Sequence, residues 1–170
     1  PDDPPQSPAS SQPKPSAAQS PYLGAQACAA CHAEIVEKQQ KASMAKALEP
    51  ISDCQILRSN TDLKFRQGQF SYRITRQGDK SIYNISDGNS EISIPLLYCF
   101  GQGKAGQTYV YEYSGAMYES RLSFYKEISG LDITLGHANN IPKTLVEAAG
   151  RQISVDETQR CFGCHTTGAV

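Results

Sequence analysis

Hydrophobic and polar residues alternate along the middle of the chain, which is the pattern of strands with one buried face. Two runs show it most clearly, Phe70-Tyr72-Ile74 and the same-face series Ile92, Ile94, Leu96, Tyr98 and Phe100. Turn sequences separate such runs at hairpin spacing: Gln77-Gly78-Asp79, Asp87-Gly88-Asn89 and Ser114-Gly115. The pattern predicts an antiparallel sheet of five or six strands over about 63–125.

The last part of this region contains two further patterns. Tyr109, Tyr111 and Tyr113 are expected to form an aromatic ladder that packs the sheet. The glycines of residues 101–106 fit the GxGxxG spacing of a dinucleotide-binding loop, but a strand pattern follows where such a loop needs a helix. We therefore interpret this segment as a hairpin connection.

Helix-forming sequence flanks the predicted sheet on both sides. Residues 24–48 are rich in Ala, Glu, Lys and Gln, which favours one helix. A second helix is expected between Pro142 and Gly150. Ser154 and Glu157 form a capping-box pattern, which predicts a third helix near the C-terminal end.

Composition limits the possible functions. The 170 residues suit one domain, and a net charge of −1 lacks the basic surface that nucleic-acid binding needs. No apolar run approaches the roughly 20 residues that span a bilayer. Residues 1–20 hold six of the ten prolines and are predicted to be a disordered tether before a domain over 21–170. An anchor in the precursor is one expected use of such a tether.

Two of the three histidines directly follow a Cys-x-x-Cys pair. The motifs are Cys28-Ala29-Ala30-Cys31-His32 and Cys161-Phe162-Gly163-Cys164-His165. CxxCH is the attachment signature of c-type haem, because two thiols one helical turn apart can each bond one vinyl group while the histidine faces the iron. Zinc knuckles or disulfide-exchange pairs also use CxxC, but neither explains the repeated histidine. We expect two covalently attached haems.

Covalent haem attachment takes place outside the cytoplasm, so the motifs predict a periplasmic or otherwise exported protein whose signal segment has been removed. Cys54 and Cys99 belong to neither motif. In an oxidising compartment they could pair as a disulfide, or they could remain two partly buried thiols. The sequence does not decide between these alternatives.

His32 and His165 are the expected proximal iron ligands. The distal candidates are His137, which lies in a turn-like segment without an evident core role, and Met44. Met117 follows the turn of a hairpin and is expected to pack instead.

The spacing between His32 and Met44 limits which iron Met44 can reach. An unbroken helix would separate their Cα atoms by about 18 Å, whereas opposite ligands of one iron need about 12 Å. Either the helix breaks before Ser43 or Met44 serves the second haem while His137 serves the first.

Residues 22–48, from Tyr-Leu-Gly-Ala-Gln-Ala-Cys-Ala-Ala-Cys-His to Ser-Met-Ala-Lys-Ala-Leu, resemble the opening haem segment of bacterial multihaem c-type cytochromes. The resemblance extends to residues 135–166 and covers less than half of the chain. In that family a distal histidine, commonly in Ser-x-His, follows CxxCH by about a dozen residues. Here Met44 follows Ser43, so the resemblance implies a His/Met haem of higher potential.

Together these patterns predict an α+β fold in which two haem-bearing helical segments flank a central antiparallel β-sheet insertion. The expected function is single-electron transfer between redox partners, either other cytochromes or a membrane oxidoreductase, without catalysis. Two alternatives stay open: a haem-based redox or gas sensor, and a small dihaem peroxidase or reductase with one open iron site.

Overall fold

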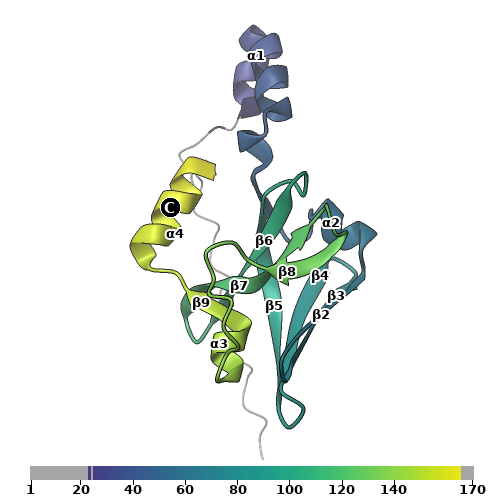
Figure 1. Ribbon diagram of the computed structural model, residues 1–170. Helices are drawn as coiled ribbons and strands as arrows, with labels where there is room; N and C mark the ends of the chain where they lie inside the picture. The colour runs from purple at the N-terminus through teal and green to yellow at the C-terminus, as the bar shows by residue number, and fades with distance from the viewer. Residues whose placement is uncertain (1–22, 24, 166–170) are drawn as a thin grey trace, which may run out of the picture.

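The computed structural model describes residues 23 and 25–165, so the tether predicted over residues 1–20 lies outside the described residues. Strands dominate the structure (Figure 1). The strands are β1 (Leu48–Pro50), β2 (Asp62–Gln67), β3 (Phe70–Gln77), β4 (Lys80–Ser86), β5 (Glu91–Phe100), β6 (Gly106–Tyr113), β7 (Ala116–Tyr125), β8 (Gly130–Ile133) and β9 (Gly150–Gln152). The helices are α1 (Ala29–Lys41), α2 (Gln55–Ser59), α3 (Leu145–Ala149) and α4 (Val155–His165), with the short 3₁₀ turns η1 (Ala25–Cys28) and η2 (Met44–Lys46).

The nine strands form one antiparallel sheet that curls into a nearly closed barrel. Strands β2 to β8 are hydrogen-bonded in chain order, while β1 pairs with β5 and β9 pairs with β7. The two ends of the path, β2 and β8, lie next to each other. Simple hairpins join most neighbours, and positive φ angles at Gly78, Gly88 and Gly115 confirm three of the predicted turns.

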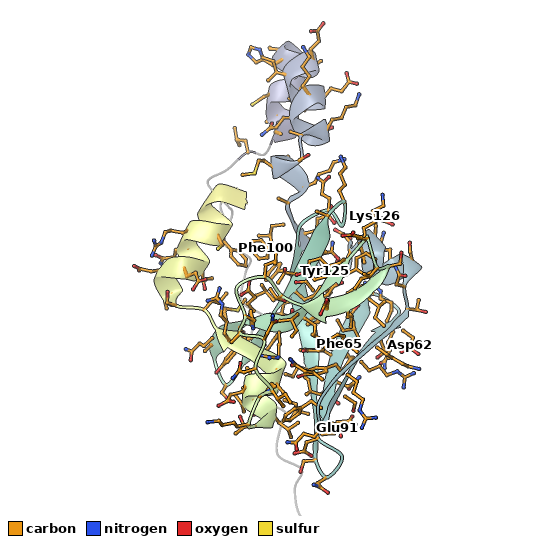
Figure 2. All side chains as sticks on the ribbon, in the orientation of Figure 1. Asp62, Phe65, Glu91, Phe100, Tyr125 and Lys126 are labelled. Atoms are coloured by element: carbon orange, nitrogen blue, oxygen red, sulfur yellow. The ribbon has the colours of Figure 1, made fainter. Side chains whose placement is uncertain are left out.

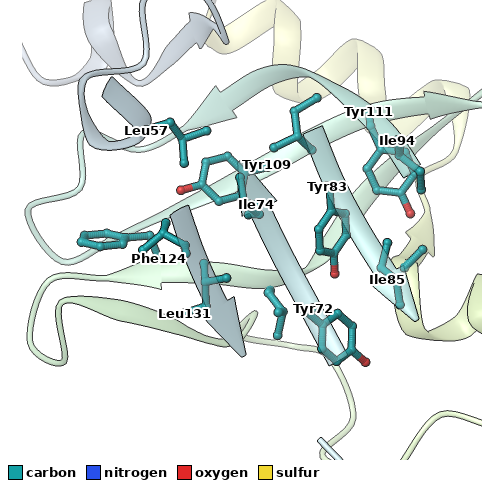
Figure 3. Packing of buried hydrophobic residues seen from close by; sticks show 14 of the residues in the cluster. Leu57, Tyr72, Ile74, Tyr83, Ile85, Ile94, Tyr109, Tyr111, Phe124 and Leu131 are labelled. Atoms are coloured by element: carbon teal, nitrogen blue, oxygen red, sulfur yellow. The ribbon is translucent and has the colours of Figure 1, made fainter. Parts of the chain in front are cut away.

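The barrel interior holds the hydrophobic core. Phe70, Tyr72 and Ile74 point inward from β3, which confirms the predicted alternation of that strand. Tyr109 and Tyr111 are also buried, as the packing role of the ladder predicted, although Tyr113 is partly exposed. Figure 3 shows Tyr72, Ile74, Tyr109 and Tyr111 with other side chains of this core. Burial of this apolar surface is the main driving force for folding.

The predicted fold class is wrong, because the sheet is the body of the molecule and not an insertion between two haem helices. Within the described residues, four short helices accompany nine strands. Helix α1 buries only Val36, so it adds little to the core. The composition of residues 24–48 favours a helix, but it does not show how much apolar surface the segment buries, and that amount is small.

The single helix predicted over residues 24–48 is also wrong. Helix α1 ends at Lys41, and the next residue, Ala42, is extended (φ −67°, ψ 139°). The 3₁₀ turn η2 follows, and Leu48 then enters the sheet opposite Phe100. The sheet therefore takes up the end of a segment whose composition favours a helix.

A β-bulge in β5 explains where the predicted alternation of that strand fails. Leu96 pairs with Tyr111 but Tyr98 pairs with Val110, so Leu97 is one extra residue. A bulge reverses the faces of the residues that follow it. Ile94 and Leu96 point inward as predicted, but beyond the bulge Cys99 enters the core, and Tyr98 and Phe100 lie only partly buried.

The glycine-rich segment at residues 101–106 connects β5 to β6, as the hairpin interpretation predicted. Gly101 has a φ of 91°, and a Cβ there would lie 2.7 Å from the carbonyl oxygen of Gly106. Only glycine fits this close approach without displacing backbone. None of the described helices is long and apolar enough to cross a membrane.

Candidate functional site

The first CxxCH motif lies at the start of α1, which projects away from the barrel in Figure 1. Cys28 ends η1 and Cys31 lies in the first turn of α1, and both thiols are free and exposed. The backbone kinks at His32 (φ −128°, ψ 41°), and this residue is exposed as well. The two thiols and the imidazole are thus accessible to a ligand from solvent.

The second motif lies in α4, whose start is fixed by a side-chain cap. The backbone N–H of Glu157 donates to Oγ of Ser154 at 3.0 Å, which confirms the cap predicted from this pair. The carboxylate of Glu157 does not complete a capping box but pairs with Arg151 at 2.6 and 3.1 Å. Helix α4 is therefore tied to β9 at its first turn.

Phe162, between the two cysteines of the second motif, anchors the other end of α4. Its ring meets Tyr98 edge-on at a centroid distance of 5.1 Å and Phe100 at 5.9 Å. In Figure 2 the side chain of Phe100 lies between β5 and α4. The bulge at Leu97 is what turns both aromatic rings toward the helix. Half-buried Cys161 precedes this anchor.

Met44 lies in η2, which packs against α4. The glycine-rich loop holds this turn in place through two hydrogen bonds. The side-chain amide of Gln102 donates to the backbone carbonyl of Ser43 at 3.1 Å, and the backbone N–H of Gly101 donates to the backbone carbonyl of Ala47 at 2.7 Å. The Met44 side chain is 56% exposed, so its thioether is not used in the core. Of the two alternatives that the spacing argument left open, the structure shows the first, because the helix breaks before Ser43.

His137 occupies a different environment, on the side of the barrel where β7 meets β9. Its Nε2 lies 3.2 Å from Oε2 of Glu119, and only 5% of the side chain is exposed. Nε of Arg151 donates to the same carboxylate oxygen at 2.8 Å. Burial acts to raise the pKa of Glu119, but the hydrogen bonds and charges of His137 and Arg151 outweigh it and hold that pKa below its ordinary value.

His137 thus belongs to a hydrogen-bonded network with Glu119 and Arg151. Its partner Glu119 lies 18 residues away, and Arg151 lies on another strand, so no local pattern could reveal this network. Met117 is half-buried in β7 opposite Glu112, outside the cluster of side chains that forms the core, so its packing role stays a prediction. Residues 164 and 165 continue α4.

No protein-family model, curated protein or solved structure matches the chain significantly. The described residues contain no group of three or more His, Cys, Asp or Glu side chains that could hold a metal ion. Together with the nearly closed barrel, these findings overturn the resemblance to bacterial multihaem c-type cytochromes. The resemblance rested on short attachment segments, and such segments need only one helical turn, which many scaffolds can supply.

Proposed function

We propose that the protein carries two covalently attached c-type haems and transfers single electrons between redox proteins in a periplasmic or otherwise exported compartment. Two CxxCH motifs in one chain are the observation that carries the proposal. It concerns attachment chemistry on a barrel scaffold and assigns no family. Covalently bound haem supplies the one-electron chemistry of its iron, which axial ligands and burial tune.

The first motif fits such a group in both chemistry and accessibility. Cys28 and Cys31 offer exposed free thiols one helical turn apart. Nearby apolar side chains are uncovered, with Leu23 86% exposed and Ile35 64% exposed. Helix α1 has a single buried residue, so it lacks the apolar contacts that normally stabilise a short helix. A porphyrin face over these residues would supply that contact.

The second motif fits in a complementary way, because α4 is already docked. Phe162 fixes the helix to β5, and the ion pair of Arg151 with Glu157 fixes its start. We assign Cys161 and Cys164 to attachment and His165 to the proximal position. Because η2 packs against α4, Met44 becomes the proposed distal ligand of this second iron.

His32 is the proposed proximal ligand of the first iron, and His137 remains the proposed distal candidate. The hydrogen bond between His137 and Glu119 would fix the ring orientation if the second nitrogen, Nδ1, bound iron. An iron with two strong protein ligands exchanges electrons without binding substrate. This is why electron transfer is proposed in preference to catalysis or gas sensing.

Carbon monoxide binding to the reduced protein tests the electron-transfer proposal. We expect the unmodified protein to resist CO at both irons, and Met44→Ala to bind it at one. Met117→Ala is the matched control, since Met117 is half-buried in the sheet, and it should resist CO like the unmodified chain. Ready CO binding by the unmodified protein would overturn the proposal and favour an enzyme or a sensor.

A further inference from the structure

Cys54 and Cys99 lie together in the core, although 45 positions separate them in the chain. Cys54 precedes α2 and Cys99 lies in β5, and neither side chain is exposed. Both are free thiols in this structure, and Sγ of Cys54 donates to Oε1 of Gln107 at 2.8 Å. A hydrogen bond from Cys99 lowers the pKa of Cys54, which places the two thiols within reach of each other. Neither cysteine belongs to a CxxCH motif, so the proposed haem chemistry leaves both unexplained.

Backbone hydrogen bonds fix the two cysteine segments relative to each other. The N–H of Ile51 donates to the carbonyl of Leu97 at 2.8 Å, which joins the turn before α2 to the bulge of β5. Glu49 pairs with Cys99 across β1 and β5, and Sγ of Cys99 lies 3.6 Å from the carbonyl oxygen of Glu49. The bulge at Leu97 is what directs Cys99 inward toward Cys54. The proximity of the thiols is therefore built into the fold.

We propose that Cys54 and Cys99 form a disulfide bond that joins the segment before α2 to strand β5. The inference rests on the export that the proposed function implies, because disulfides persist in oxidising compartments. It does not depend on haem binding itself. The bond would hold the η2–β1 segment, and with it Met44, against the sheet.

The oxidant is a protein disulfide of the thiol-oxidase class. The Cys54 thiolate attacks one sulfur of the oxidant, and the other sulfur leaves as a thiolate. The Cys99 thiolate then attacks Cys54 Sγ in the mixed disulfide and releases the second oxidant thiolate. The two cysteine protons pass to the oxidant thiolates, so two thiols are oxidised and one disulfide is reduced.

Burial sets the order of these events. Since both side chains are inaccessible in the folded barrel, the exchange occurs before the barrel closes. Once buried, the pair cannot exchange with Cys28 and Cys31, which remain exposed. The buried disulfide therefore takes no part in thiol exchange with these two residues, whose thiols must be reduced for addition to haem vinyl groups.

Alkylation and peptide mapping of the exported full-length protein test the proposal. The protein is denatured and treated with iodoacetamide with and without prior reduction. We expect Cys54 and Cys99 to be unlabelled and cross-linked without reductant, and both to be labelled after it. A disulfide lowers the mass of the joined peptides by two hydrogens, about 2 Da. Labelling of both cysteines in the unreduced exported protein would overturn the proposal.

Two controls separate this proposal from the proposed function. If haem attachment fails, label appears on the CxxCH peptides, while the Cys54–Cys99 cross-link is still expected. A Cys54→Ala, Cys99→Ala double variant controls for other effects of reductant. Reductant should lower the melting temperature of the unmodified protein by roughly 5–10 °C and leave that of the double variant unchanged. Equal shifts in both would contradict a stabilising disulfide.

Discussion

Replacing Phe162 by alanine should release α4, the helix of the second CxxCH motif, without unfolding the barrel. Phe162 is 7% exposed and is the only buried residue among those of α4 whose side chains the structure describes. Truncating a buried phenylalanine costs about 3–5 kcal/mol, including the edge contacts with its aromatic neighbours. Because α4 lies at the edge of the core, we expect a loss at the low end of this range, about 3 kcal/mol. This loss corresponds to a shift of roughly 100-fold in the equilibrium between docked and undocked α4.

Amide hydrogen exchange measures this effect directly, since local opening exposes the helix amides without global unfolding. Exchange in α4 should accelerate roughly 100-fold in Phe162→Ala, while β3 and β4 keep their protection. Val155→Ala is the matched control, because Val155 lies in the same helix and is 74% exposed. Unchanged protection of α4 in Phe162→Ala would refute the anchoring role. Equal acceleration in the central strands would show that Phe162 supports the whole barrel.

Three further predictions concern other parts of the structure. Glu119→Gln should destabilise the protein at pH 7 by on the order of 2 kcal/mol. The pKa of Glu119 is lower in the folded protein than its ordinary value of 4.5, so on acidification the unfolded chain takes up the proton first. The difference in unfolding free energy between the unmodified protein and the variant, measured by urea titration, should therefore shrink below about pH 4.5. Gly150→Ala should destabilise the folded protein by more than about 4 kcal/mol, because a Cβ there overlaps the carbonyl oxygen of Glu119. Gly88→Ala is the control, since Gly88 has open space around it, and thermal melting should show a far smaller loss of stability. Met44→Ala should abolish the weak thioether-to-iron absorption of the oxidised protein and lower one midpoint potential in a redox titration; persistence of that absorption would transfer the ligand role to Met117.

Local patterns predicted local structure well. The alternation of Phe70, Tyr72 and Ile74 identified a buried strand face, because side-chain period alone sets which residues point inward. The Ser154 cap was predicted for a similar reason, since a cap is a contact between residues three positions apart. The glycine-rich loop was recognised as a hairpin because the residues after it have strand character.

Features that depend on distant contacts could not be predicted. The barrel closes because β2 meets β8, and nothing in either strand marks the other as its neighbour. The bulge at Leu97 inserts one residue into a regular alternation. This insertion alone turns Cys99 toward the core and Tyr98 away from it. At the candidate site, the CxxCH residues stand out by spacing, but the contact of His137 with Glu119 and the anchoring of α4 by Phe162 arise only from the fold.

The intact mass of the exported protein, measured after denaturation, tests the central claim most directly. Covalent attachment at both motifs predicts a mass equal to the polypeptide plus two haems, with a pyridine haemochrome spectrum of matching stoichiometry. Cys28→Ala with Cys31→Ala should remove one haem, and Cys161→Ala with Cys164→Ala should remove the other. A mass equal to the polypeptide alone, or a native mass carrying only zinc, would contradict the account.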